Sequence, residues 1–164
     1  MKTPYNEIVN IASIGSQTNP ISLNDILRKA NDEQLTPAAQ NKERVLFLGI
    51  DVQQDFMDNG ALGVPGAHGD VERMTQFIYN NMDKITNIAV SIDTHTPHQI
   101  FHPCWWIDED GNNPAPYTPI TLADLDSGKY RAVIYPRQSR DYVEHLDKDG
   151  KKTLCVWSYH CLQG

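Results

Sequence analysis

Two short, continuous apolar runs limit what this chain can fold into more than any other feature of its sequence. They read VLFLGI at residues 45–50 and NIAVSI at residues 87–92. Runs of this length without polar alternation are typical of strands that are buried on both faces of a parallel sheet. Between them, residues 70–84 place apolar side chains at helical spacing. The order strand, helix, strand predicts a βαβ unit in which the two strands are parallel.

The second half of the sequence predicts further elements of the same sheet. Residues 103–127 are rich in proline and are expected to form an irregular excursion. A short strand is expected around YRAVIY at residues 130–135, followed by a helix that Ser139 caps and that ends near residue 149. TLCVWS at residues 153–158 is the third strong strand. Together these elements predict an α/β protein with a doubly wound parallel sheet.

The chain divides into a polar N-terminal segment and a domain that begins at Arg44. The N-terminal segment contains one helix signal, in which Ser22 is the N-cap and Asp25 follows three positions later. We therefore expect an N-terminal extension at residues 1–43, packed on an α/β domain at residues 44–164.

Charge and composition exclude several classes of function. The formal net charge of −7 argues against a nucleic-acid-binding protein, because such proteins carry basic stripes. No apolar run approaches the roughly 20 residues that a membrane span needs. The first residues lack the layout of a signal peptide, and the odd count of three cysteines indicates no disulfide framework. We expect a cytoplasmic protein that binds neither nucleic acid nor membranes.

Ionisable residues follow each of the three predicted strands. Asp51 follows the first strand, Asp93 and His95 follow the second, and His160 follows the third. Ligands of open parallel sheets bind at the carboxyl ends of the strands. The sequence therefore predicts that these four side chains meet at one edge of the sheet.

Asp93 and His95 are two positions apart, so in an extended backbone both side chains leave the same side of the chain. With His160 they provide two imidazoles and one carboxylate, a set that suits a single divalent ion of zinc, iron or manganese. His98 or His102 could add a ligand or support one, and each could equally face solvent. Asp93 and His95 could also act only as caps of the loop that they begin.

Asp51 and two aromatic residues are candidates for the chemistry beside such an ion. Asp51 follows a run of apolar residues, so we expect it to lie half-buried at the end of its strand and to accept and return a proton. It could instead only fix the turn. Phe56 and Trp157 flank Asp51 and His160 in the sequence, and they could form a substrate pocket or belong to the core.

Three ordered motifs resemble those of the nicotinamidase and isochorismatase-like cysteine hydrolases. GIDVQQDFMDNGALGVPGA at residues 49–67 is similar to their opening motif, and SIDTHTPH at residues 91–98 is similar to their Asp-x-His metal segment. VWSYHCLQG at residues 156–164 is similar to the segment that brings in another metal-binding histidine. The resemblance covers residues 45–102 and 153–164.

This resemblance implies a Rossmann-like, three-layer fold and an enzyme that hydrolyses nicotinamide or a related small amide through a cysteine thioester, releasing ammonia. It implies that Asp51 deprotonates the nucleophile and that Phe56 and Trp157 line the pocket for a flat aromatic amide. The ligands that it implies for one divalent metal ion are Asp93, His95 and His160, with His98 or His102 as an additional one.

The sequence departs from the family in two respects. Ser158 stands where the family often has proline. In addition, the family's nucleophilic cysteine and, in members with long insertions, its lysine would come after the point where this chain stops. Cys161 matches a cysteine of the family that is not the nucleophile. The resemblance therefore implies the N-terminal portion of a longer protein, incomplete at its C-terminus and inactive as an isolated chain.

Two other classes of function stay open at the level of sequence. One is an isochorismatase-like hydrolase that acts on a vinyl ether without a metal, which Asp93, His95 and His160 argue against. The other is a non-catalytic fragment that binds metal or assembles with another subunit. We expect a homo-oligomer, because exposed sheet edges and apolar faces favour association.

Overall fold

The computed structural model of this protein describes residues 1–163. The chain has a mixed α/β structure and folds as two compact units, Met1–Asp93 and Thr94–Gly164. The strands of the described residues form three sheets of two strands each. None of the helices in this part of the chain is long and apolar enough to cross a membrane.

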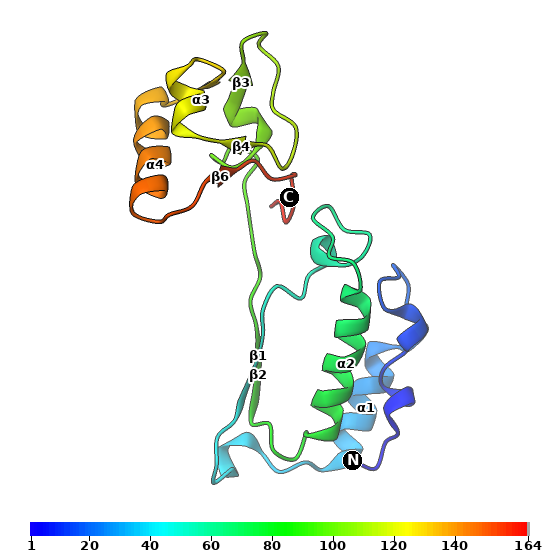
Figure 1. Ribbon diagram of the computed structural model, residues 1–164. Coiled ribbons are helices and arrows are strands. Elements are labelled where there is room, and N and C mark those ends of the chain that lie inside the picture. Colours follow the sequence, from blue (N-terminus) through cyan, green and yellow to red (C-terminus); the bar gives the residue numbers. More distant parts are fainter. Residues whose placement is uncertain (164) are drawn as a thin grey trace. The chain divides into compact units, whose positions relative to one another are not determined.

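The first unit contains the strand–helix–strand arrangement that the sequence predicts. β1 (Leu46–Gly49) and β2 (Asn87–Val90) are parallel, with Leu46 opposite Asn87. The helix α2 (Ala67–Asn80) connects them in sequence and lies beside them (Figure 1). The predicted parallel pair and the helix between its strands are therefore confirmed.

The N-terminal segment folds against α2. The helix α1 (Leu23–Glu33) begins where predicted, because Oγ of the N-cap Ser22 accepts a hydrogen bond from the N–H of Asn24 at 3.2 Å. Tyr5 contacts α2 through a hydrogen bond between its hydroxyl and that of Thr75 at 2.8 Å. Three short 3₁₀ helices complete this segment: η1 (Tyr5–Glu7), η2 (Ile11–Ser13) and η3 (Ala38–Gln40).

The two strands are much more exposed than their apolar sequences predict. Leu48 in β1 is 53% exposed and Val90 in β2 is 61% exposed. The helix α2 contacts β1 where the rings of Phe47 and Phe77 lie 6.0 Å apart. No other strand pairs with β1 or β2 within residues 1–163. The prediction that both strands are buried on both faces is therefore wrong, because the described residues do not supply the second layer that such strands need.

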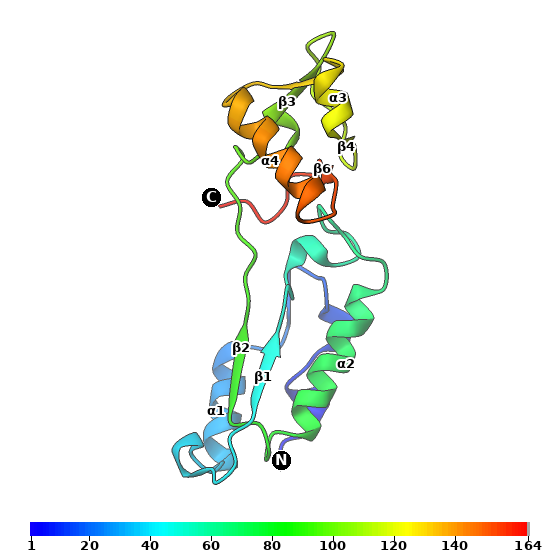
Figure 2. The same ribbon diagram turned by 60° about the vertical axis from the view of Figure 1, so that its left-hand side comes forward.

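The second unit is built from short strands and two helices. β3 (Trp106–Asp108) pairs antiparallel with β5 (Tyr130–Ala132), and β4 (Pro119–Ile120) pairs antiparallel with β6 (Leu154–Cys155). The remaining elements of this unit are η5 (Pro103–Trp105), α3 (Leu122–Asp126) and α4 (Pro136–Lys148). Figure 2 shows α3 and α4 next to each other.

The core of the second unit changes the interpretation of residues 103–127. Trp106 and Ile120 are 1% and 0% exposed, and they belong to one cluster with the buried Val143 and Leu154. This stretch is therefore part of the folded core rather than an irregular excursion. Its strands have three and two residues, which is too short to produce a periodic signal in the sequence.

Two further predictions are corrected in this unit. The strand expected at residues 153–158 is limited to Leu154–Cys155, and its partner β4 is antiparallel, so it does not extend the parallel pair. The helix α4 begins at Pro136, so Ser139 is not its cap. Ser139 lies inside the helix, where its hydroxyl accepts a hydrogen bond from Nε1 of Trp105 at 2.9 Å. Ser139 is thus a buried residue that pairs with Trp105, and its presence before the apolar positions of the helix did not mark the N-cap.

Candidate metal centre

Three of the predicted metal ligands come together in the structure. Asp93, His95 and His160, hereafter the metal group, each offer one ligand atom, and these atoms lie within 4.8 Å of one another. Asp93 and His95 flank Thr94 shortly after β2, whereas His160 comes from the segment after β6. The ring centres of His95 and His160 are 4.9 Å apart, and His160 is only 5% exposed. Residues that are distant in the sequence therefore meet at one point.

Backbone hydrogen bonds hold His160 beside His95. The N–H of His95 donates to the carbonyl oxygen of Cys161 at 2.9 Å, and the N–H of Gln163 donates to the carbonyl oxygen of His95 at 2.9 Å. These bonds form a parallel bridge between His95 and Leu162. The main chain, rather than a third strand of the β1–β2 sheet, therefore places the two rings next to each other.

The side chain of Gln53 forms two hydrogen bonds with the backbone of Asp93. The sequence did not indicate this role. Nε2 of Gln53 donates to the carbonyl oxygen of Asp93 at 3.0 Å, and Oε1 of Gln53 accepts from the N–H of Asp93 at 2.5 Å. This two-point contact continues the pairing of β1 and β2 beyond the last paired residues. The signal that could have indicated it is a glutamine two positions after Asp51, at the end of a strand.

The ring of His160 is oriented by a further hydrogen bond. Its Nδ1 lies 2.7 Å from the carbonyl oxygen of Ser158, to which a protonated Nδ1 donates. In the neutral ring, this tautomer carries its lone pair on Nε2. Histidines that bind metals commonly donate their other ring N–H to a backbone carbonyl in this way. His160 thus has a hydrogen bond of the kind that is typical of metal-binding histidines.

The two additional histidines differ in their surroundings. His98 is exposed, whereas His102 is 0% exposed. The ring centre of His102 lies 5.9 Å from that of His95 and 6.1 Å from that of His160. Burial lowers the pKa of His102 below its ordinary value of 6.5, and the nearby rings of His160 and His95 lower it further. A buried, neutral imidazole therefore lies next to the metal group.

Asp51 is exposed in the structure, so the prediction of a half-buried carboxylate is wrong. The chain adopts a left-handed φ of 58° at this residue, which ends the extended conformation of β1. The N–H of Asp51 donates to Oγ of Ser91 at 3.1 Å, and that hydroxyl lies 3.3 Å from Oδ1 of Asp51. The turn therefore places the carboxylate in solvent. The apolar run that precedes Asp51 does not predict this turn.

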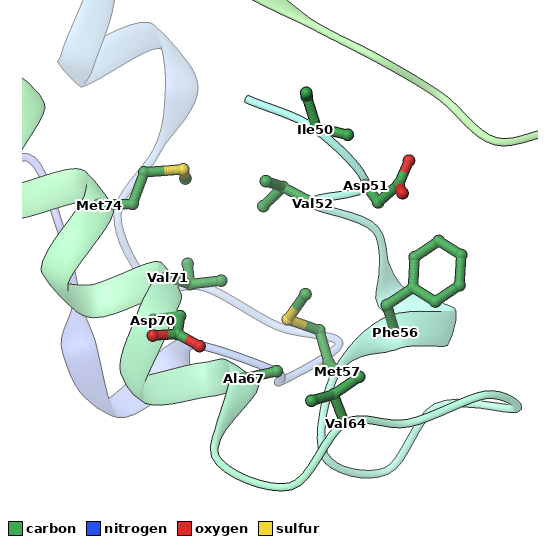
Figure 3. Close-up of a pocket in the computed structure, with 10 residues that line it drawn as sticks. All are labelled: Ile50, Asp51, Val52, Phe56, Met57, Val64, Ala67, Asp70, Val71 and Met74. Carbon is green, nitrogen blue, oxygen red and sulfur yellow. The ribbon is translucent and has the colours of Figure 1, made fainter. Parts of the chain in front are cut away.

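A cavity of about 370 Å³ lies between the end of β1, the loop that follows it and α2. Its lining is mostly apolar and includes Asp51 and Phe56, the latter in η4 (Gln54–Phe56). Figure 3 shows the carboxylate of Asp51 and the ring of Phe56 on the same side of the loop that follows β1. Trp157 belongs to the second unit, where it is 38% exposed and its ring meets that of Tyr117 edge-on at 5.9 Å. Phe56 thus lines a pocket, and Trp157 lies at the surface of its own unit.

The donor set of the metal group fits a divalent transition-metal ion. Two imidazole nitrogens and one carboxylate oxygen suit Zn²⁺, Fe²⁺ and Mn²⁺, and three protein ligands leave positions for a small molecule. His160 is buried, and Asp93 and His95 are half-buried, so an ion held there is partly shielded from water. The group could therefore hold one such ion.

Comparisons of this chain with models of protein families, with curated proteins and with solved structures find no match. The functional conclusion therefore depends on the geometry of the site and on the motifs of the sequence.

Proposed function

We propose that this chain carries the metal-binding part of a nicotinamidase-like amidohydrolase with a doubly wound, isochorismatase-like fold. One observation carries the proposal. The two motifs that resemble the family's metal segments contribute Asp93 with His95 and, separately, His160, and the ligand atoms of these residues lie within 4.8 Å of one another. The parallel pair of β1 and β2 with α2 supports the proposal, because doubly wound sheets are built from such units.

Each residue has a role in the proposed reaction. A divalent zinc, iron or manganese ion held by the metal group would act as a Lewis acid toward a polar atom of the substrate. Asp51 would take the proton of a cysteine thiol, and the thiolate would attack the amide carbonyl. The proton would leave with ammonia, and water would then release the carboxylic acid from the thioester. Phe56, which lines the cavity of the first unit, would contact the flat ring of the amide.

The proposal assigns the nucleophile to none of the three cysteines of the chain. The thiol of Cys104 donates to the carbonyl oxygen of Pro97 at 3.2 Å. Cys155 lies in β6, where burial raises the pKa of its thiol and so disfavours the thiolate. Cys161 follows His160, at the position of the family's non-nucleophilic cysteine. We therefore propose that a further segment or chain supplies the thiol.

Metal analysis of the purified chain tests this proposal. We expect one divalent ion per chain, and we expect His160→Ala to weaken binding by at least about tenfold, because it removes a ligand. The matched control is His145→Ala, which removes an exposed histidine of α4 and should leave the affinity unchanged. Elemental analysis gives the stoichiometry, and competition with a chromophoric chelator gives the affinity.

Two outcomes would contradict this reading. A chain that binds no divalent ion would favour the metal-independent hydrolase that acts on a vinyl ether. In a parallel assay with nicotinamide, the isolated chain should release no ammonia. Release that Cys161→Ala abolishes would show that Cys161 is the nucleophile after all.

The exposure of β1 and β2 favours a second candidate function, a non-catalytic module that binds metal and assembles with another subunit or a second copy. Exposed apolar side chains such as Leu48 and Val90 are typical of protein interfaces when they are contiguous. Under either candidate the partners are a small amide or a protein subunit in the cytoplasm, and not nucleic acid or a membrane.

A further inference from the structure

The backbone pairing of β1 and β2 ends before the chain reaches Asp93. The last paired residues are Gly49 and Val90, and the N–H of Ser91 still donates to the carbonyl oxygen of Gly49 at 2.9 Å. The chain after β1 then turns at Asp51, where φ is 58°. A metal ligand needs a backbone that is held in place, because its side chain leaves from that backbone. The paired part of β1 does not extend far enough to provide this for Asp93.

The side chain of Gln53 takes the place of the next residue of the strand. Its Oε1 accepts from the N–H of Asp93 at 2.5 Å, and its Nε2 donates to the carbonyl oxygen of Asp93 at 3.0 Å. A side-chain amide can do this because it carries one acceptor and one donor group, as a peptide unit does. Ser91 makes a similar contact, in which its Oγ accepts from the N–H of Asp51 at 3.1 Å. Side chains therefore continue the ladder where the main chain of β1 has turned away.

The contact with Asp93 requires an amide at the length of glutamine. Asparagine is shorter by one methylene group, about 1.5 Å, and would not span the same distance. An ionised glutamate only accepts hydrogen bonds, so one of its oxygens would face the carbonyl oxygen of Asp93. The two hydrogen bonds thus depend on the chemical identity of Gln53 and not only on its size.

The segment that carries two of the metal ligands is fixed at both of them. Gln53 holds the backbone of Asp93, and the bridge to the segment after β6 holds the backbone of His95. Only Thr94 lies between these two residues. The two attachments therefore set the directions in which the carboxylate and the imidazole leave the chain.

We propose that Gln53 is a positioning residue of the metal group, which acts on the ion through Asp93 without binding the ion itself. This inference rests on the metal site of the proposed function. Gln53 also lies two residues after Asp51, so its amide ties the loop that carries the proposed base to a metal ligand. Hydrogen-bond partners that support metal ligands typically contribute a factor of about 10 to 100 to metal affinity.

The test compares Gln53→Met with Gln54→Met in the full chain. Methionine has nearly the shape of glutamine but cannot replace the amide in hydrogen bonding. We expect Gln53→Met to lower the affinity for Zn²⁺ by about 10-fold or more and to change the visible spectrum of the Co²⁺-loaded chain, which reports ligand geometry. Gln54→Met makes the same chemical change at the exposed neighbouring residue and should leave both unchanged.

A double-mutant cycle separates a positioning role from a general effect on folding. The substitution Asp93→Ala removes the carboxylate but keeps the backbone that Gln53 holds. If Gln53 acts through the carboxylate, then Gln53→Met should have little further effect on Zn²⁺ affinity in the Asp93→Ala background. An equal loss of affinity in both backgrounds would show that Gln53 only stabilises the fold, and would overturn the proposal.

The remaining outcomes distinguish this inference from the proposed function. If Gln53→Met leaves the affinity and the Co²⁺ spectrum unchanged while His160→Ala weakens binding, then Gln53 does not position a ligand, although the metal site stands. If the wild-type chain binds no divalent ion, then both the inference and the metal site fail.

A measurement on the wild-type chain removes any dependence on how well the variants fold. If the contact of Gln53 favours metal binding, then metal binding must favour the contact to the same degree. In ¹⁵N spectra, saturating Zn²⁺ should therefore slow the exchange of the Gln53 side-chain amide hydrogens with water and leave those of Gln54 unaffected. Exchange at Gln53 that does not change with Zn²⁺ would contradict the proposal.

Discussion

One carboxylate fastens the N-terminus of the first unit. Glu33, the last residue of α1, accepts hydrogen bonds from the N–H groups of Thr3 at 2.5 Å and Lys2 at 2.8 Å. Hydrogen bonding from Thr3, and next from Lys2, lowers the pKa of Glu33 from 4.5 to about 2. Because the folded-state pKa is depressed, the stability from this contact is fully present above pH 4.5 and is lost as the pH falls toward 2.

We expect Glu33→Gln to remove this pH dependence. The thermal midpoint of the variant should be lower than that of the wild type at neutral pH, and the difference should shrink between pH 4.5 and 2. Thermal unfolding followed by circular dichroism at several pH values measures it. Glu109→Gln, which changes an exposed carboxylate of the second unit, is the control. A difference that stays constant down to pH 2 would contradict the role of Glu33.

The ligands of the metal group could be predicted from the sequence, but the residues that support them could not. Asp93 and His95 follow a long apolar run at the spacing of an extended chain, and His160 follows a second run. Gln53 and His102 matter because of the backbone groups that folding places next to them. Local sequence carries no record of such neighbours, so it assigned no role to Gln53 and could not choose between His98 and His102.

At the scale of elements, the pair of β4 and β6 organises the core of the second unit. Ile120 in β4 is 0% exposed and packs in one cluster with Leu154 of β6 and Val143 of α4. Each of the two strands has only two residues, so their hydrogen bonds alone cannot fix the pair. Side-chain burial must therefore supply most of its stability.

We expect Ile120→Ala to lower the free energy of unfolding of the second unit by about 2–5 kcal/mol, because it leaves a cavity in this cluster. Urea unfolding followed by tryptophan fluorescence reports this unit alone, since all three tryptophans of the chain lie in it. Val133→Ala, at a side chain that is 52% exposed, should cost less than about 0.5 kcal/mol. Equal losses for the two variants would mean that the cluster is not the core.

The sequence predicted the elements of the first unit better than those of the second for a physical reason. An apolar run of six residues or a helix of fourteen residues repeats its pattern often enough to be recognised. β3, β4, β5 and β6 have two or three residues each, and tertiary contacts decide their conformation. Proline-rich sequence around them therefore resembled a loop.

At the scale of the whole molecule, the most consequential feature is the apolar surface that β1 and β2 expose. Leu46, Leu48 and Ile50 are 60%, 53% and 64% exposed, and Ile88 and Val90 are 49% and 61% exposed. Parallel strands are normally covered on both faces, and contiguous apolar surface favours association. We therefore expect the isolated chain to associate.

Light scattering at increasing protein concentration tests this expectation. The wild-type chain should show a molecular mass that rises with concentration, and Leu48→Lys should reduce the rise because it places a charge on the apolar surface. Val133→Lys adds the same charge at a side chain that is 52% exposed in the second unit and serves as the control. A wild-type chain that stays monomeric throughout would count against this surface as an interface.

The bridge between His95 and Leu162 sets an order of events during synthesis. Until the ribosome has made residues 160 and 161, Asp93 and His95 lack the imidazole of His160 and the carbonyl of Cys161 to which His95 bonds. Two protein ligands bind an ion with low affinity, so a nascent chain that has only Asp93 and His95 should not retain a cation. Loading of a complete metal group then waits until the segment that carries His160 has been made and has formed its bridge to His95.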